Sequence, residues 1–111
     1  MDMNSLKRTL QTNQLKLLQK MAPLHPWIEG SLVSTSRFCG KKNCACHHGG
    51  LKHPVLYVTW KEKGKTVSLY IPRKLENDVR RWVQNYRKLK ELIRKVSDIQ
   101  KQIVRLREDK P

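Results

Sequence analysis

Three cysteines and a histidine fall within fifteen residues, and no other feature constrains the fold of this chain as strongly. The residues are Cys39, Cys44, Cys46 and His53, in the spacing Cys-x4-Cys-x-Cys-x6-His, and the chain has no other cysteine. Thiolate and imidazole groups are the ligands that Zn²⁺ prefers, and a structural zinc site takes four of them in a closed tetrahedron. Glycines 49–50 allow the chain to turn back and present the histidine. The pattern therefore predicts one structural Zn²⁺ held by these four residues.

Two other interpretations of the cysteines are open. They could be ordinary thiols in a surface turn, but Lys41, Lys42, His47 and His48 make that turn too polar to bury them. A catalytic zinc would need an open coordination position and a general base, and only Glu29 and Glu62 lie near enough in the sequence. His47 and His48 could replace His53 as ligands or could be exposed loop residues.

The charge of the chain predicts a polyanionic partner. Lys and Arg number 24 against 9 Asp and Glu, which gives a formal net charge of +15. Residues 31–71 carry seven basic residues and one acidic residue, so the excess is not confined to a tail. Such a surface is typical of nucleic-acid-binding proteins, although charge can also serve only solubility.

The basic residues that we predict to contact nucleic acid surround the cysteines, follow the expected hairpin and line the last helix. They are Arg37, Lys41, Lys42, Lys52, Lys61, Lys63, Lys65, Arg73, Arg80, Arg87 and Arg94. The last four are seven residues apart and would share one side of a helix, where they could follow a phosphate backbone or form an ordinary solvated face.

The order of the predicted elements indicates an α+β fold. An amphipathic helix is expected over residues 4–22, capped by Asn4 or Ser5, and a connector over 23–30 should bury Trp27 and Ile28. Strands are expected over 31–38, 54–61 and 65–71, with Gly64 in the turn of a hairpin. A long helix should follow from Pro72 to about residue 108, since no Gly or Pro interrupts it.

We therefore expect an N-terminal helix, a small three-stranded antiparallel sheet clasped by zinc, and a long C-terminal helix. The corresponding segments are residues 1–30, 31–71 and 72–111, which together form one compact domain with a helical extension. No segment has the length and apolar character of a membrane span or a signal peptide, and the free-thiol chemistry fits a cytoplasmic protein.

The last helix carries an apolar stripe that is longer than a small sheet can cover. Its members are Leu75, Val79, Trp82, Tyr86, Leu89, Ile93, Val96, Ile99, Ile103 and Leu106. The first helix offers a matching stripe of Leu6, Leu10, Leu17 and Met21, which could cover part of it. The remainder predicts a coiled-coil homodimer through the C-terminal helix.

Several short motifs resemble a family of small, basic, functionally uncharacterised prokaryotic proteins. They are Gly30-Ser31-Leu32-Val33, Cys39-Gly40-Lys41-x-Asn43-Cys44-x-Cys46, His53-Pro54 with Tyr57, Gly64-Lys65, Tyr70-Ile71-Pro72, and a final helix with Val79, Trp82, Asn85-Tyr86 and Leu89. The resemblance covers roughly residues 29–105. It departs at residues 53–55, where members read His-Gly-Pro and then an aromatic residue, so the turn after the histidine is in question but not the ligand. The resemblance implies no established activity, and it carries an expectation of association with mobile elements.

These observations favour a nucleic-acid-binding zinc protein with an accessory or regulatory role, and DNA ranks ahead of RNA as its partner. The chain lacks a Gly-rich phosphate loop and a Ser/His/acid set of convincing spacing, so we predict that it is not an enzyme and has no small-molecule substrate. The alternative is a protein–protein adaptor that oligomerises through its long helix, with zinc serving only the fold.

Overall fold

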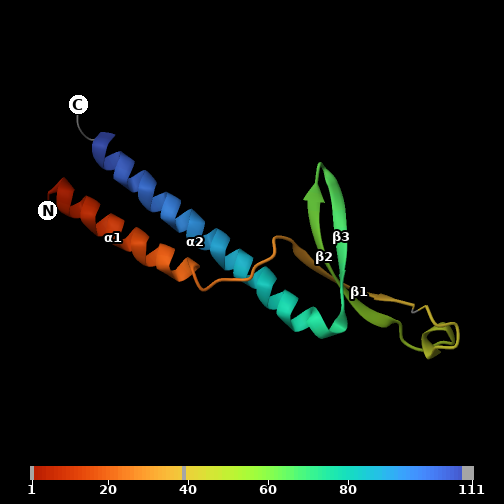
Figure 1. The fold of residues 1–111 in the computed structure, drawn as a ribbon. Coiled ribbons are helices and arrows are strands. Elements are labelled where there is room, and N and C mark those ends of the chain that lie inside the picture. Colours follow the sequence, from red (N-terminus) through yellow and green to blue (C-terminus); the bar gives the residue numbers. More distant parts are fainter. Residues whose placement is uncertain (1, 39, 109–111) are drawn as a thin grey trace. The chain divides into compact units, whose positions relative to one another are not determined.

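A computed structural model describes residues 2–38 and 40–108 and has the α+β architecture that the sequence predicts (Figure 1). The N-terminal helix α1 spans Met3–Met21, and the strands are β1 (Ser31–Arg37), β2 (His53–Glu62) and β3 (Lys65–Ile71). Two short 3₁₀ helices, η1 (Ala45–His47) and η2 (Arg73–Leu75), precede β2 and α2 respectively, and the long helix α2 spans Glu76–Glu108. Each predicted strand lies within one residue of the observed one at both ends.

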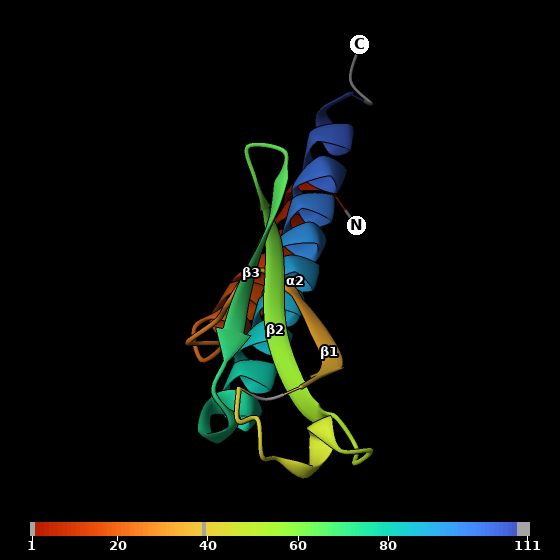
Figure 2. The same cartoon turned by 90° about the vertical axis from the view of Figure 1, so that its right-hand side faces the viewer.

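The three strands form one antiparallel sheet in the order β1-β2-β3, with β2 in the centre (Figure 2). The turn between β2 and β3 consists of Lys63 and Gly64, whose φ angles are 50° and 80°. Positive φ at both central residues defines the two-residue hairpin turn that matches the twist of antiparallel strands. The prediction that Gly64 forms this turn is therefore confirmed.

The core of the sheet lies on one of its two faces, because side chains alternate along a strand. Leu56 and Val58 of β2 are buried there together with Ile71, and α2 contributes Val79 and Val83 to the same cluster. Ile28, Leu32, Trp60 and Trp82 pack against this cluster and are partly buried. Leu69 pairs with Val58 in the register, yet its side chain is 49% exposed.

The chain divides into two compact units. Residues 28–83 form the first, which we call the sheet unit, and residues 1–27 with 84–111 form the second, which we call the helix unit. The sheet unit contains all three strands, both 3₁₀ helices and the beginning of α2.

Within the helix unit, α1 lies antiparallel to the C-terminal part of α2 (Figure 1). Nε2 of Gln14 donates to the Val96 carbonyl at 3.2 Å and to Oε1 of Gln100 at 3.0 Å. Beyond the end of α1, the Trp27 ring lies 5.3 Å from that of Tyr86, between centroids. Leu89 and Ile103 are buried in this unit, so α1 covers this part of the stripe, as the sequence predicts.

Four sequence-based expectations about these helices are wrong. The cap of α1 is Asp2, whose carboxylate accepts the Ser5 N–H at 2.7 Å, and not Asn4 or Ser5. Trp27 is 51% exposed, because its ring contacts that of Tyr86 at the surface of the helix unit.

The other two expectations concern which residues face the partner helix. Leu6 is exposed, since the face of α1 that meets α2 is centred on Gln14 and Leu10. Ile93 is 54% exposed, and Leu92 is half-buried in its place. The buried stripe of α2 continues from Leu89 to the residue three positions later, Leu92, and not to the residue four positions later.

Candidate functional site

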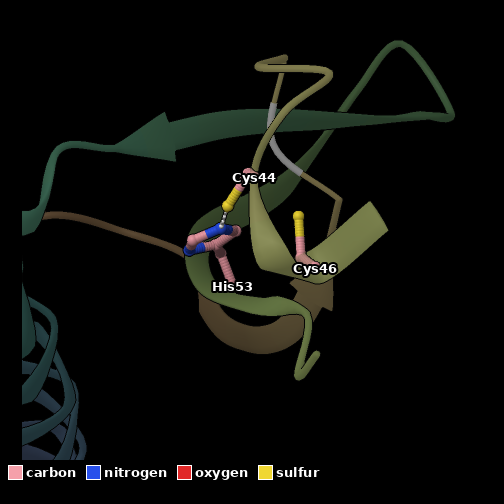
Figure 3. A group of neighbouring side chains, drawn as sticks. All are labelled: Cys44, Cys46 and His53. Carbon is pink, nitrogen blue, oxygen red and sulfur yellow. Dashed lines mark hydrogen bonds between the residues drawn. The ribbon is translucent and has the colours of Figure 1, made fainter. Parts of the chain in front are cut away.

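Cys44, Cys46 and His53 bring their donor atoms to one point in the sheet unit. One donor atom from each residue lies within 4.8 Å of the other two, and the distance from Cys44 Sγ to His53 Nε2 is 3.2 Å (Figure 3). A tetrahedral zinc with its usual bond lengths of about 2.0–2.3 Å holds its donors roughly 3.5–3.8 Å apart. The group is therefore of the right chemistry and size to hold a metal ion.

Local backbone structure positions the two thiols. Cys44 precedes η1 and Cys46 lies inside it, and the Cys44 N–H donates to the Lys41 carbonyl at 3.1 Å. The N–H of His47 in turn donates to the Cys44 carbonyl at 3.0 Å. These two tight turns place side chains that are two residues apart in the sequence on the same side of the loop.

His53 is held by the sheet and not by the loop. It is the first residue of β2 and is paired with Arg37, the last residue of β1. The site therefore joins a side chain fixed by strand pairing to two side chains fixed by η1, at the end of the sheet where β1 and β2 separate.

The connection from residue 38 to residue 52, which we call the knuckle, has almost no apolar core of its own. Among its described residues only Cys46 is buried, at 3% exposure, whereas Leu51 is 95% exposed. The expectation that this turn is too polar to bury a thiol is therefore wrong for Cys46. Ordering a loop of this length costs conformational entropy that burial of apolar surface usually offsets. Metal binding supplies that free energy in small domains where the core does not.

The structure distinguishes between the three histidines that the sequence offered as possible metal ligands. His53 joins Cys44 and Cys46, whereas His47 and His48 are exposed and do not belong to that group. The His47 ring is instead stacked on Phe38, with centroids 5.2 Å apart and planes inclined by 22°. Cys39, the remaining predicted ligand, lies outside the described residues.

Two glycines allow the knuckle to return to the sheet, as the sequence predicts. Gly49 has a φ of 87°, which L side chains rarely adopt. The N–H of Gly50 donates to the Ala45 carbonyl at 2.7 Å, and a Cβ at this position would lie 2.5 Å from that oxygen. The backbone at residue 50 is thus too close to η1 for any side chain.

Replacing Gly50 by Ala is expected to destabilise the knuckle by about 1–3 kcal/mol, because the methyl group must displace η1 and with it Cys46. The measurement is metal retention during titration with a competing chelator, together with hydrogen exchange across residues 40–53. Gly40→Ala is the matched control, since a Cβ there meets nothing within 4 Å. Equal metal retention in the two variants would contradict the role given to this contact.

The predicted nucleic-acid-binding residues are all exposed, and nine of the eleven belong to the sheet unit. The knuckle contains Lys41, Lys42 and Lys52, and the hairpin turn contains Lys63. The strands carry Arg37 in β1, Lys61 in β2 and Lys65 in β3, while Arg73 lies in η2 and Arg80 in the first part of α2. The helix unit contains the other two, Arg87 and Arg94. The ion pairs Arg81–Asp78 (2.9 Å) and Lys95–Glu91 (3.6 Å) involve none of them.

The predicted line of four arginines along the last helix is wrong at its first member. Arg73 lies in η2, where the Leu75 N–H donates to the Pro72 carbonyl at 2.9 Å, and α2 begins only at Glu76. Arg73 instead lines a recess on the sheet.

That recess lies on the face of the sheet opposite the core, and its aromatic residues were not predicted as functional. We call this face of the sheet, opposite the core, the open face. The strand register places Val33 of β1, Tyr57 of β2 and Tyr70 of β3 side by side across its centre. The recess has a volume of about 560 Å³, and Arg37, Phe38, Tyr57, Tyr70 and Arg73 are among its lining residues. The alternation of β2 already places Tyr57 away from the core, but only the register places Tyr70 beside it.

Of three comparisons with known proteins, the one with protein-family models found a match. A protein-family model matches residues 5–81, which is more than half of the chain. No curated protein and no solved structure matches. In the described part of the chain, no helix combines the length and the apolar character needed to cross a membrane.

Proposed function

Because this chain belongs to the family described as "Domain of unknown function (DUF6788)", which offers no activity to transfer, we propose from its geometry that it binds nucleic acid through a zinc-stabilised sheet unit. Membership of a family without assigned function agrees with the resemblance in the sequence. The matched region begins inside α1 and ends early in α2, so it contains the whole sheet and the knuckle.

The observation that carries this proposal is the concentration of exposed positive charge around the knuckle and the open face. Residues 28–83 contain eleven Lys and Arg against four Asp and Glu, a net charge of +7. Lys and Arg side chains neutralise phosphates and release counterions, which supplies most of the affinity in sequence-independent binding. A surface of this sign on a folded unit favours a polyanionic partner.

Zinc is the metal that the donor set favours. Two thiolates and an imidazole are typical of Zn²⁺ sites, whereas Mg²⁺ and Ca²⁺ select oxygen ligands. We propose Cys39 as the fourth ligand. In this proposal Cys44, Cys46 and His53 hold the ion, and the ion keeps Lys41, Lys42 and Lys52 in a fixed arrangement beside the sheet.

The finer expectations drawn from the sequence stay predictions within this proposal. They are a preference for DNA over RNA, an accessory or regulatory role beside mobile elements, the absence of enzymatic activity, and a cytoplasmic location.

The proposal is tested by titrating fluorescently labelled oligonucleotides of about 20 nucleotides with the full chain at about 50 mM salt. Single strands and duplexes of DNA and RNA are compared by anisotropy. We expect saturable binding with a Kd in the micromolar range or tighter. Absence of binding to all four probes at this ionic strength would overturn it.

Exposed apolar side chains favour a second candidate function, the adaptor that self-associates through α2. Ile93 and Val104 are about half exposed on α2, and Val104 lines a groove with Ser97 and Gln100. Since α1 already covers Leu89 and Ile103, a second copy of this chain would have to dock on this separate stripe. Sedimentation of the wild type and of the Ile93→Lys variant distinguishes the two functions. A wild-type dimer that does not bind nucleic acid, and that dissociates when Ile93 is replaced by Lys, supports the adaptor.

A further inference from the structure

The open face presents a row of side chains that the fold itself does not bury. In the register, Val33 of β1 pairs with Tyr57 of β2, and Tyr57 pairs with Tyr70 of β3. Tyr70 is 53% exposed and Val33 is 42% exposed, while Tyr57 is half-buried between them. Apolar and aromatic surface of this kind, grouped on three adjacent strands, is typical of a binding surface.

The two tyrosines are arranged so that one supports the other. Their ring centroids are 5.9 Å apart and their planes are inclined by 68°, an edge-to-face contact. Arg37 donates a hydrogen bond to the Tyr57 hydroxyl, and its guanidinium carbon lies 5.9 Å from the centre of the Tyr57 ring. Tyr57 is therefore fixed on two sides, whereas the more exposed ring of Tyr70 offers a flat surface to a ligand.

Positive charge flanks these rings within the same recess. Arg37 and Arg73 both line it, and Glu76 is the only acidic residue among its described lining residues. At the end toward the knuckle, Phe38 also lines the recess, and the Lys52 ammonium lies 4.9 Å from the centre of its ring. The recess thus combines flat aromatic surface with cationic side chains around it.

A single-stranded nucleic acid is the partner whose chemistry matches both features. Unpaired bases stack on aromatic side chains without regard to sequence, while the backbone phosphates meet Lys and Arg along the groove. A duplex keeps the faces of its bases stacked inside, so it offers phosphates and the edges of bases in its grooves, but no base face that could stack on a tyrosine. A peptide could also contact the tyrosines, but only a strongly acidic one would offer a counterpart to the net charge of +7 in this unit.

We propose that the open face of the sheet binds single-stranded nucleic acid, with a base stacked on Tyr70 and phosphates against Arg37 and Arg73. This inference rests on the proposed function and makes it more specific, since it names the form of the nucleic acid and the residues that contact bases. The knuckle adjoins this surface through Phe38, and the metal-site residue His53 of β2 lines the same recess.

The experiment measures the affinity of the full chain for labelled 12-nucleotide oligo-dT and oligo-U and for a 12-base-pair duplex, in the wild type and in Tyr70→Leu. Removing one stacking ring should weaken single-strand binding at least about fivefold. Duplex binding should not change, since the charge of the chain is the same. Tyr70→Phe keeps the ring and should retain the wild-type affinity.

Leu69→Ala is the matched control, because Leu69 precedes Tyr70 and is 49% exposed but lies on the opposite face of the sheet. Thermal unfolding of each variant monitors the fold. Tyr70→Leu that stays folded and binds single strands as tightly as the wild type would overturn the inference and leave general nucleic-acid binding intact. A duplex preference in the wild type would also overturn it, whereas binding of an acidic peptide alone would overturn both proposals.

Discussion

Replacing Cys46 by Ser should reduce bound zinc from about one ion per chain to a small fraction of that. A structural zinc site contributes apparent binding free energies of about 10–16 kcal/mol, and a hydroxyl is a poor substitute for a thiolate that helps to close the tetrahedron. The group that loses a member is compact, since the donor atoms of Cys44, Cys46 and His53 lie within 4.8 Å of one another. Native mass spectrometry after exposure to a competing chelator measures the loss.

The same variant should unfold the knuckle and leave the core of the sheet in place. The buried cluster of Leu56, Val58 and Ile71 contains no residue of the knuckle, so its packing does not depend on the ion. Hydrogen exchange should therefore lose protection over residues 40–53 and retain it in the centre of β2. A uniform loss of protection would show instead that the metal holds the entire unit.

His47→Ala is the matched control for the ligand changes. His47 lies one residue from Cys46, but its ring is stacked on Phe38 and it is not part of the donor group. We expect this variant to keep its zinc, whereas His53→Ala loses it. Cys39→Ser tests the fourth ligand in the same assay. Full zinc occupancy in Cys46→Ser, or unchanged protection of the knuckle after chelation, would contradict the metal assignment.

The sequence could predict the sheet because local signals determine it. Alternation in residues 54–61 separates the two faces of β2, although it does not say which face is buried, and Gly64 suits the positive φ that a two-residue hairpin requires. The metal-ligand spacing likewise depends on neighbouring residues, which is why Cys44, Cys46 and His53 could be grouped before the fold was known.

Features that depend on tertiary partners could not be predicted in this way. Leu92 and Ile93 both fit an apolar helical stripe, and only the position of α1 decides which of them is buried. The sequence predicts that Trp27 is buried, yet its side chain is about half exposed and its ring contacts that of Tyr86. Only the strand register identifies Tyr70 as a neighbour of Tyr57, because the alternation of side chains along one strand does not say which residues of separate strands meet.

Raising the salt concentration from about 50 to about 200 mM should weaken single-strand binding roughly 50-fold. This estimate assumes about four phosphate contacts and a salt slope of about −0.7 per contact for single strands. Arg37, Arg73 and Lys52 beside the recess, with one further lysine of the knuckle, are enough to supply them. The observable is the slope of log affinity against log salt concentration in the anisotropy titration.

Arg73→Gln should reduce the magnitude of that slope by about 0.7, since one phosphate contact is lost. Lys95→Gln is the matched control: it removes the same charge from the helix unit, where Lys95 is paired with Glu91 at 3.6 Å. If affinity arose only from the net charge of the chain, the two variants would change the slope equally. A difference between them therefore separates binding at the recess from the bulk attraction of a chain with 24 basic residues.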